Sequence, residues 1–80
     1  MQEREIAEKL EASFRKVFNM NTLEIKREMT ANDIDKWDSL THMLLISEIE
    51  DTFEIRFKLK ELNRMKNVGD MIDLISEKMQ

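Results

Sequence analysis

Hydrophobic residues recur at helical spacing along most of this chain. In the first segment Ile6, Leu10, Phe14, Val17 and Phe18 lie at i, i+4, i+8, i+11 and i+12, positions that share one face of an α-helix. The charged residues of the segment fall mostly on the other side. The pattern predicts an amphipathic helix over residues 3–18.

Residues 19–38 carry no sustained period. The stretch is rich in asparagine, threonine and aspartate, which favour turns and helix caps. A loop this long in a compact domain usually has a function or is fixed by its own apolar side chains. We expect both here, with four residues as the fixing points: Leu23, Ile25, Met29 and Ile34.

The pattern predicts a second helix from Ser39 to about Thr52. One predicted face contains Leu40, Met43, Leu44, Ser47 and the later Phe53. That face is widened by three further apolar residues, Leu45, Ile46 and Ile49. We therefore expect this helix to be the most buried of the chain.

A short third helix is predicted over residues 59–65, and a fourth helix follows it. Asn67 is the expected N-cap of the fourth helix, with Asp70 close to its positive end. The expected buried stripe of this helix is Val68, Met71, Ile72, Ile75 and Met79. Because no segment alternates for long enough to form a strand, the prediction is an all-α bundle. It has three main helices, a short third helix and a long first loop, within one domain over residues 1–80.

Composition excludes several classes of function. The 80 residues include no cysteine and one histidine, so no disulfide, thiolate nucleophile or transition-metal site is expected. A net charge of −4 disfavours nucleic-acid binding, which needs a phosphate-neutralising surface. The polar N-terminal residues do not resemble a signal peptide, and no apolar run is long enough for a membrane span. A cytoplasmic protein without membrane insertion is expected.

Ser39 is the clearest candidate for a residue with a chemical function. It follows Asp38, an expected N-cap by residue type, at the predicted start of the second helix. A hydroxyl at this place lies beside backbone N–H groups that have no partner within the helix. Such a helix end is a natural binding place for a phosphate group.

Three short sequence motifs along the chain resemble motifs of acyl carrier proteins, in the same order and with similar spacing. They are Asp38-Ser39-Leu40, the Ile-Glu-Asp-Thr-Phe-Glu-Ile run at residues 49–55, and Val-Gly-Asp at residues 68–70. The segment from Trp37 to Met79 resembles the second half of such a protein. The first predicted helix matches only in being amphipathic. The Trp-Asp-Ser-Leu-Thr-His sequence at residues 37–42 most resembles free-standing, specialised carriers.

The resemblance implies a four-helix bundle with a prosthetic group on Ser39. That group is 4′-phosphopantetheine, transferred from coenzyme A by a phosphopantetheinyl transferase, and its thiol carries an acyl group as a thioester. The protein would be a monomer and no enzyme itself, serving acyl-transferring or acyl-condensing enzymes of fatty-acid, polyketide or other specialised lipid biosynthesis. Its attachment site would comprise Ser39 with Asp38, Trp37, Leu40 and His42, and its acyl-chain lining would comprise Met43, Ile46, Leu62, Met65 and Met71.

Two side chains near Ser39 admit more than one interpretation. Trp37 is either a lid over the end of the core, which we favour, or a wall for the pantetheine. His42 is either a surface residue or a neighbour of the arm that donates to its phosphate when protonated. A hydrolase using Ser39 and His42 is disfavoured, because the sequence has no glycine-rich nucleophile elbow.

The sequence departs from the family pattern in two places. The third-helix region is basic, whereas such carriers usually keep this region acidic for docking. We therefore expect a docking surface of mixed sign that selects dedicated enzymes, comprising Glu48, Glu50, Asp51, Lys58, Lys60 and Arg64. Secondly, Glu54 follows Phe53 where many relatives have glycine, which predicts a strained, left-handed helix end.

Two other functions stay open at this point. An aminoacyl or peptidyl carrier would have the same attachment site with an amino acid on the arm. An unmodified helical interaction module would keep the fold and lack the prosthetic group.

Overall fold

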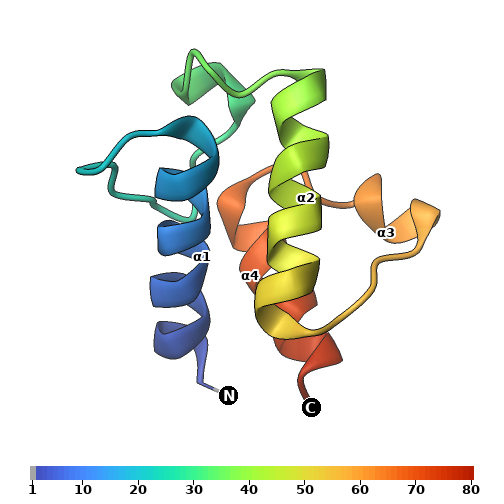
Figure 1. Cartoon of the computed structure of the whole chain (residues 1–80). Coiled ribbons are helices and arrows are strands. Elements are labelled where there is room, and N and C mark those ends of the chain that lie inside the picture. Colours follow the sequence, from blue (N-terminus) through green and yellow to red (C-terminus); the bar gives the residue numbers. More distant parts are fainter. Residues whose placement is uncertain (1) are drawn as a thin grey trace.

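The computed structural model describes residues 2–80, which form four α-helices and one 3-10 turn with no strand. The helices are α1 (Glu3–Phe18), α2 (Ser39–Phe53), α3 (Leu59–Leu62) and α4 (Val68–Lys78), and the turn is η1 (Ala31–Asp33). α1 packs against both α2 and α4, and α3 lies to the side of these three (Figure 1). The predicted all-α bundle with three main helices and one short helix is confirmed.

The core lies between the three long helices. α1 contributes Ile6, Leu10, Phe14 and Phe18, each at most 2% exposed, as the periodicity predicted. Complete burial of an apolar side chain of this size contributes about 1.5–3 kcal/mol. This one-sided contact accounts for the position of α1 in the bundle.

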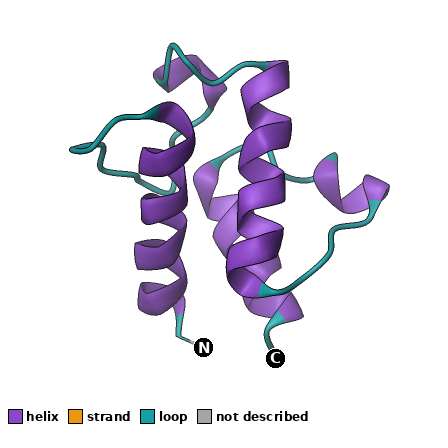
Figure 2. Ribbon diagram, in the orientation of Figure 1, coloured by secondary structure: helices purple, strands orange, loops and turns teal. Residues whose placement is uncertain are grey.

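The long first connection crosses the end of the bundle opposite both termini (Figure 2). Ile34 is buried, and the other three predicted fixing residues pack partly buried against the core. The Arg15 guanidinium also donates to the Leu23 carbonyl oxygen at 2.8 Å, and the Val68 N–H donates to the Met29 carbonyl oxygen at 2.9 Å. The loop is therefore fastened to α1 and to the start of α4, as expected.

The loop approaches α4 closely at Gly69. Its N–H donates to the Arg27 carbonyl oxygen at 2.8 Å, and a Cβ at Gly69 would lie 3.2 Å from that oxygen. The Arg27 side chain pairs with Asp73 at 2.9 Å and with Glu3 at 3.3 Å. The hydrogen bond to Asp73, more than any other contact, raises the pKa of Arg27.

The predicted buried face of α2 is confirmed at Phe53 and at the three widening residues, but its four other members are exposed. Leu40, Met43 and Leu44 are 73%, 54% and 55% exposed, and Ser47 is exposed as well. The side chains that α2 buries are Leu45, Ile46, Ile49 and Phe53. Apolar residues surround most of this helix, so its periodicity does not select one face, and contact with α1 decides which face is buried.

α4, rather than α2, is the most buried helix relative to its length. It buries six of its eleven residues, namely Val68, Gly69, Met71, Ile72, Leu74 and Ile75. Leu74 was absent from the predicted stripe, and Met79 is only partly buried. The predicted cap is confirmed, because the Asn67 Oδ1 accepts the Asp70 N–H at 2.7 Å.

α3 is shorter than predicted, ending at Leu62 rather than Met65. An ion pair ties it to the end of α4: Lys78 Nζ lies 2.8 Å from Glu61 Oε1, with both side chains less than 20% exposed. The hydrogen bond from Lys78 is the main reason that the pKa of Glu61 is lowered. This ion pair joins α3 to the end of α4, and Leu62 packs partly buried against the core.

We expect Glu54→Gly to raise the free energy of unfolding by about 0.5–1 kcal/mol, since it removes left-handed strain but adds unfolded-chain entropy. Glu54 ends α2 with φ 56° and ψ 48°, which bears out the predicted left-handed end. Urea denaturation followed by circular dichroism measures the change. Asn19→Gly is the matched control at the left-handed end of α1, where the gain should be smaller because asparagine tolerates this conformation. A loss of stability in Glu54→Gly would contradict the prediction.

Candidate functional site

Ser39 is the first residue of α2, and a capping box fixes the chain there. The Asp38 Oδ1 accepts the Thr41 N–H at 2.9 Å, and the Thr41 Oγ1 accepts the Asp38 N–H at 2.7 Å. Hydrogen bonding from the Thr41 N–H is the main reason that the pKa of Asp38 is lowered. The carboxylate therefore stays ionised at neutral pH and holds the helix end in place.

Thr41 is a positioning residue that sequence analysis missed. Its hydroxyl also donates to the Lys36 carbonyl oxygen at 2.7 Å, which connects the capping box to the incoming loop. The signal was present as an Asp-x-x-Thr spacing, a variant of the capping box.

The Ser39 side chain is exposed. Its hydroxyl takes part in none of the side-chain hydrogen bonds found over residues 2–80. A serine at a helix start usually serves as a cap through its own oxygen, but here Asp38 has that role. The Ser39 hydroxyl is therefore open to a reaction with an external group.

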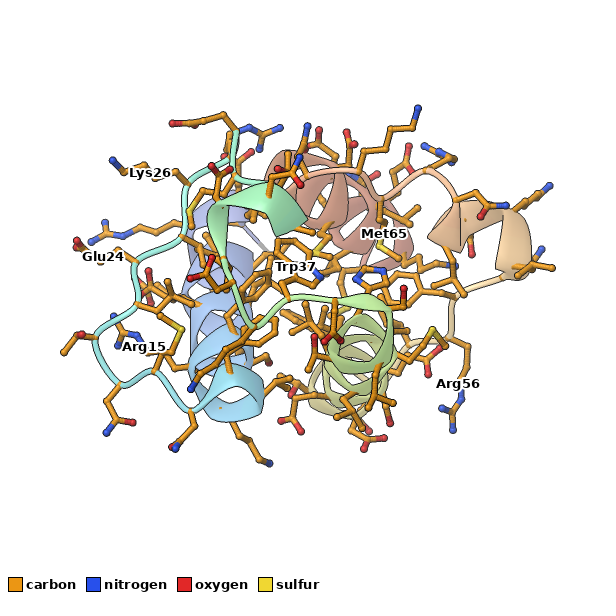
Figure 3. The ribbon with its side chains drawn as sticks, turned by 90° about the horizontal axis from the view of Figure 1, so that it is seen from above. Arg15, Glu24, Lys26, Trp37, Arg56 and Met65 are labelled. Carbon is orange, nitrogen blue, oxygen red and sulfur yellow. The ribbon has the colours of Figure 1, made fainter. Side chains whose placement is uncertain are left out.

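Trp37 closes the end of the core beside Ser39. It is 6% exposed and meets Phe14 edge-on, with ring centroids 5.2 Å apart. Seen from above, Trp37 lies centrally between the helices (Figure 3). The favoured interpretation of Trp37 as a lid agrees with this position, and the same ring also lines a pocket next to Ser39.

His42 is partly buried and forms a hydrogen bond with Trp37. The indole Nε1–H donates to the His42 Nδ1 at 3.0 Å, and the two rings stack with centroids 5.9 Å apart. Burial lowers the pKa of His42 below its ordinary value of 6.5. In the neutral imidazole the proton lies on Nε2, because Nδ1 accepts a hydrogen bond. The role of His42 toward the phosphate stays a prediction.

A pocket of about 340 Å³ opens beside the Ser39 hydroxyl. Three parts of the chain line it: η1, the residues around the start of α2, and the connection before α4. Its lining residues are Ala31, Trp37, Asp38, Ser39, His42, Met65 and Lys66. Figure 3 shows Met65 beside Trp37 at this end of the molecule.

The residues predicted to line an acyl chain lie in three different environments. Met65 lines the pocket, and Ile46 and Met71 are buried in the core. Leu62 packs partly buried against that core. Met43 lies on the exposed face of α2, which corrects its predicted place in the interior. Leu40, predicted beside the cofactor, follows Ser39 in sequence but is also on the surface.

Family comparison agrees with this geometry. The family model described as the phosphopantetheine attachment site matches residues 8–75. The chain belongs to the acyl carrier protein family. An acyl carrier protein of Streptococcus pyogenes serotype M3 is 34% identical over 73 residues, spanning 91% of this chain and 95% of that protein. One of Streptococcus pneumoniae serotype 4 is 41% identical over 54 residues, spanning 68% and 69%.

A solved structure of the family has the same fold. The solution NMR structure of a holo acyl carrier protein from Geobacter metallireducens is 46% identical and superposes with a TM-score of 0.86, covering 91% of this chain and 84% of that one. Membership identifies the prosthetic group as covalent 4′-phosphopantetheine. The exposed Ser39 hydroxyl, the open pocket and the Lys66 cation fit such a group. Within residues 2–80, no helix is long and apolar enough to cross a membrane.

The residues predicted for partner docking divide into paired and unpaired groups. Lys16 pairs with Glu48 at 3.2 Å, and Arg64 pairs with Glu77 at 3.7 Å. The Glu50 carboxylate accepts the Phe57 N–H at 2.9 Å and is largely covered. Asp51, Lys58 and Lys60 are exposed, and their side chains form no ion pair within the described part of the chain. These three residues are the freest to meet a partner.

Lowering the pH from 7.5 to 5.5 should reduce the free energy of unfolding through His42. Because its pKa is lower in the folded chain than in the unfolded chain, the contribution is complete above about 6.5 and is lost as the pH falls toward the folded value. The lowered pKa values of Asp38 and Glu61 affect the free energy of unfolding only at lower pH, since the ordinary pKa values of these groups are 3.8 and 4.5. His42→Gln keeps an acceptor for the Trp37 N–H and cannot titrate. If the urea midpoints of the unchanged protein and of His42→Gln vary equally with pH, His42 is not the cause of the pH dependence.

Proposed function

We propose that Ser39 is the attachment site, through a phosphodiester, of the 4′-phosphopantetheine arm that carries acyl intermediates. The observation that supports this most is the exposed Ser39 hydroxyl at the first residue of a capped α2, beside an open pocket. Asp38 and Thr41 hold the helix end rigid for the modifying transferase. The bound arm supplies a thiol, and the protein itself catalyses no step.

The physical advantage of such a carrier is local concentration. A flexible arm keeps the intermediate near any enzyme that docks on the protein, so each transfer becomes effectively intramolecular. The partners we propose are a phosphopantetheinyl transferase and acyl-transferring or acyl-condensing enzymes. The cytoplasmic location expected from the sequence stays a prediction.

An acyl cargo is favoured over an aminoacyl cargo. The similar proteins are named acyl carrier proteins, and Trp37 and Met65 give the pocket two apolar walls. An aminoacyl carrier remains the second candidate, since the attachment chemistry is the same. Mass spectrometry of the loaded species from the native host distinguishes the two cargoes.

The direct test is intact mass after incubation with a phosphopantetheinyl transferase, coenzyme A and Mg²⁺. We expect one phosphopantetheine to be added, and peptide mapping should place it on Ser39. An unmodified protein after treatment with several transferases of broad specificity would support the unmodified interaction module instead.

Reversing the unpaired cations at the start of α3 should change the choice of partner. With Lys58→Glu and Lys60→Glu combined, loading by the cognate acyl-transferring enzyme should slow several-fold, on the order of tenfold at low salt, because charge acts chiefly on encounter. Acceptance by housekeeping fatty-acid enzymes should improve. Both effects should shrink in high salt.

The matched control is Lys9→Glu with Lys26→Glu. Both lysines are exposed, and they give the same change in net charge away from α3. If both double variants alter loading equally, net charge rather than the α3 surface is responsible.

A further inference from the structure

Lys66 supplies the cation of the pocket beside Ser39. It is the one basic residue among the seven that line this pocket, and its side chain is exposed. Its backbone N–H donates to the Asp70 Oδ2 at 3.2 Å, which fixes the main chain there. Within residues 2–80 the Lys66 ammonium has no carboxylate partner within 4.0 Å. Its charge is therefore available to a group in the pocket.

His42 supplies a hydrogen-bond donor to the same pocket. Its Nδ1 is occupied by the Trp37 indole N–H at 3.0 Å, so the ring proton lies on Nε2. Over the described residues, no side-chain nitrogen or oxygen is both sealed from solvent and unpartnered. The Nε2–H therefore remains accessible while Trp37 fixes the orientation of the ring.

The Asp38 carboxylate places a negative charge next to Ser39. This carboxylate caps α2 and is ionised at neutral pH, because hydrogen bonding lowers its pKa. A phosphodiester on the adjacent Ser39 would add a second negative charge. Like charges this close repel each other unless a cation offsets them.

We propose that Lys66 and His42 hold the proximal half of the phosphopantetheine arm in this pocket. Lys66 is the counter-ion of the phosphodiester, and the His42 Nε2–H donates to an oxygen of the pantetheine. The arm then rests on Trp37 and Met65 in its unloaded state. This inference rests on the proposed attachment at Ser39, and it assigns two positioning residues on different segments of the chain.

The test compares amide and phosphorus NMR spectra of the unmodified and phosphopantetheine-bearing proteins. In the unchanged protein, modification should shift the amides of Ala31, Met65 and Lys66, none of which is a sequence neighbour of Ser39. Lys66→Met keeps an apolar stem and removes the charge. The ratio of docked to free phosphopantetheine arm should then fall about two- to fivefold, the range expected for one exposed charge pair. The amide shift changes at Ala31 and Met65 should be correspondingly smaller.

Lys60→Met is the matched control, because Lys60 is an exposed lysine of α3 and is not among the residues that line the pocket. Its spectra should match those of the unchanged protein. His42→Gln should weaken docking of the arm. The phosphorus resonance of the phosphodiester should still be shifted in this variant, because Lys66 is present. Equal effects of Lys66→Met and Lys60→Met would overturn the role of Lys66.

The outcome separates this inference from the proposed function. A missing phosphopantetheine mass would refute the attachment at Ser39, and docking with it. A correct mass with no amide shifts at Ala31, Met65 and Lys66 would refute docking alone, leaving a carrier whose arm moves freely in solvent.

Discussion

Replacing Ser39 by alanine will abolish phosphopantetheine attachment while leaving the fold intact. The phosphodiester needs a hydroxyl, and Ser39 presents one that is exposed beside the pocket. Because Asp38 and Thr41 make the capping contacts, loss of the Ser39 hydroxyl removes none of them. We expect the free energy of unfolding to change by no more than about 0.5 kcal/mol.

Intact mass after transferase treatment and urea denaturation measure these two results. The other serines provide controls with different surroundings. Ser47→Ala removes an exposed hydroxyl from the middle of α2, and Ser13→Ala removes a buried one that donates to the Lys9 carbonyl oxygen. Both variants should be modified like the unchanged protein. Attachment that persists in Ser39→Ala would rule out this serine as the site.

Helices with one-sided sequence patterns could be predicted well. The buried apolar residues of α1 and most of those of α4 follow from a single apolar stripe. In α2 the apolar residues surround the helix, so only packing against α1 determines that Leu45 and Ile49 are buried while Leu40 and Leu44 are exposed. A tertiary contact overrode the local pattern there.

Short elements were harder to predict than long ones. η1 begins after Thr30, whose side chain accepts the Asn32 N–H while Asp33 accepts the Thr30 N–H. This Thr-x-x-Asp spacing is a local capping signal that passed unnoticed within a loop. α3 ends at Leu62, and its Glu61 pairs with Lys78 of α4, a contact between two helices that no local pattern predicts.

The capped start of α2 at Ser39 was predictable because its signal is local. Asp38, Ser39 and the helix start are adjacent in sequence, so residue type and periodicity locate them. The pocket is different, since Ala31, His42 and Lys66 meet only after the loop has folded over α1 and the start of α4. The lowered pKa of His42 likewise depends on burial in the folded chain, which no spacing rule predicts.

Trp37→Ala should cause the largest loss of stability among these variants, about 3–5 kcal/mol, because it removes a buried aromatic ring and leaves a cavity. Trp37 contacts Phe14 and Phe18 at the end of the core and fixes His42 by a hydrogen bond. A loss of this size is a large fraction of the stability of a small domain. Urea denaturation followed by circular dichroism measures it.

Leu59→Ala is the matched control for apolar truncation, since Leu59 is 77% exposed and its loss should change the free energy of unfolding by at most about 0.5 kcal/mol. Trp37→Phe separates packing from hydrogen bonding, because it keeps an aromatic ring but removes the N–H donor to His42. We expect an intermediate loss, together with a higher pKa of His42, since Nδ1 then becomes free to accept a proton. Equal losses in Trp37→Ala and Leu59→Ala would mean that Trp37 does not close the core. An unchanged His42 pKa in Trp37→Phe would instead attribute the lowered value to burial alone.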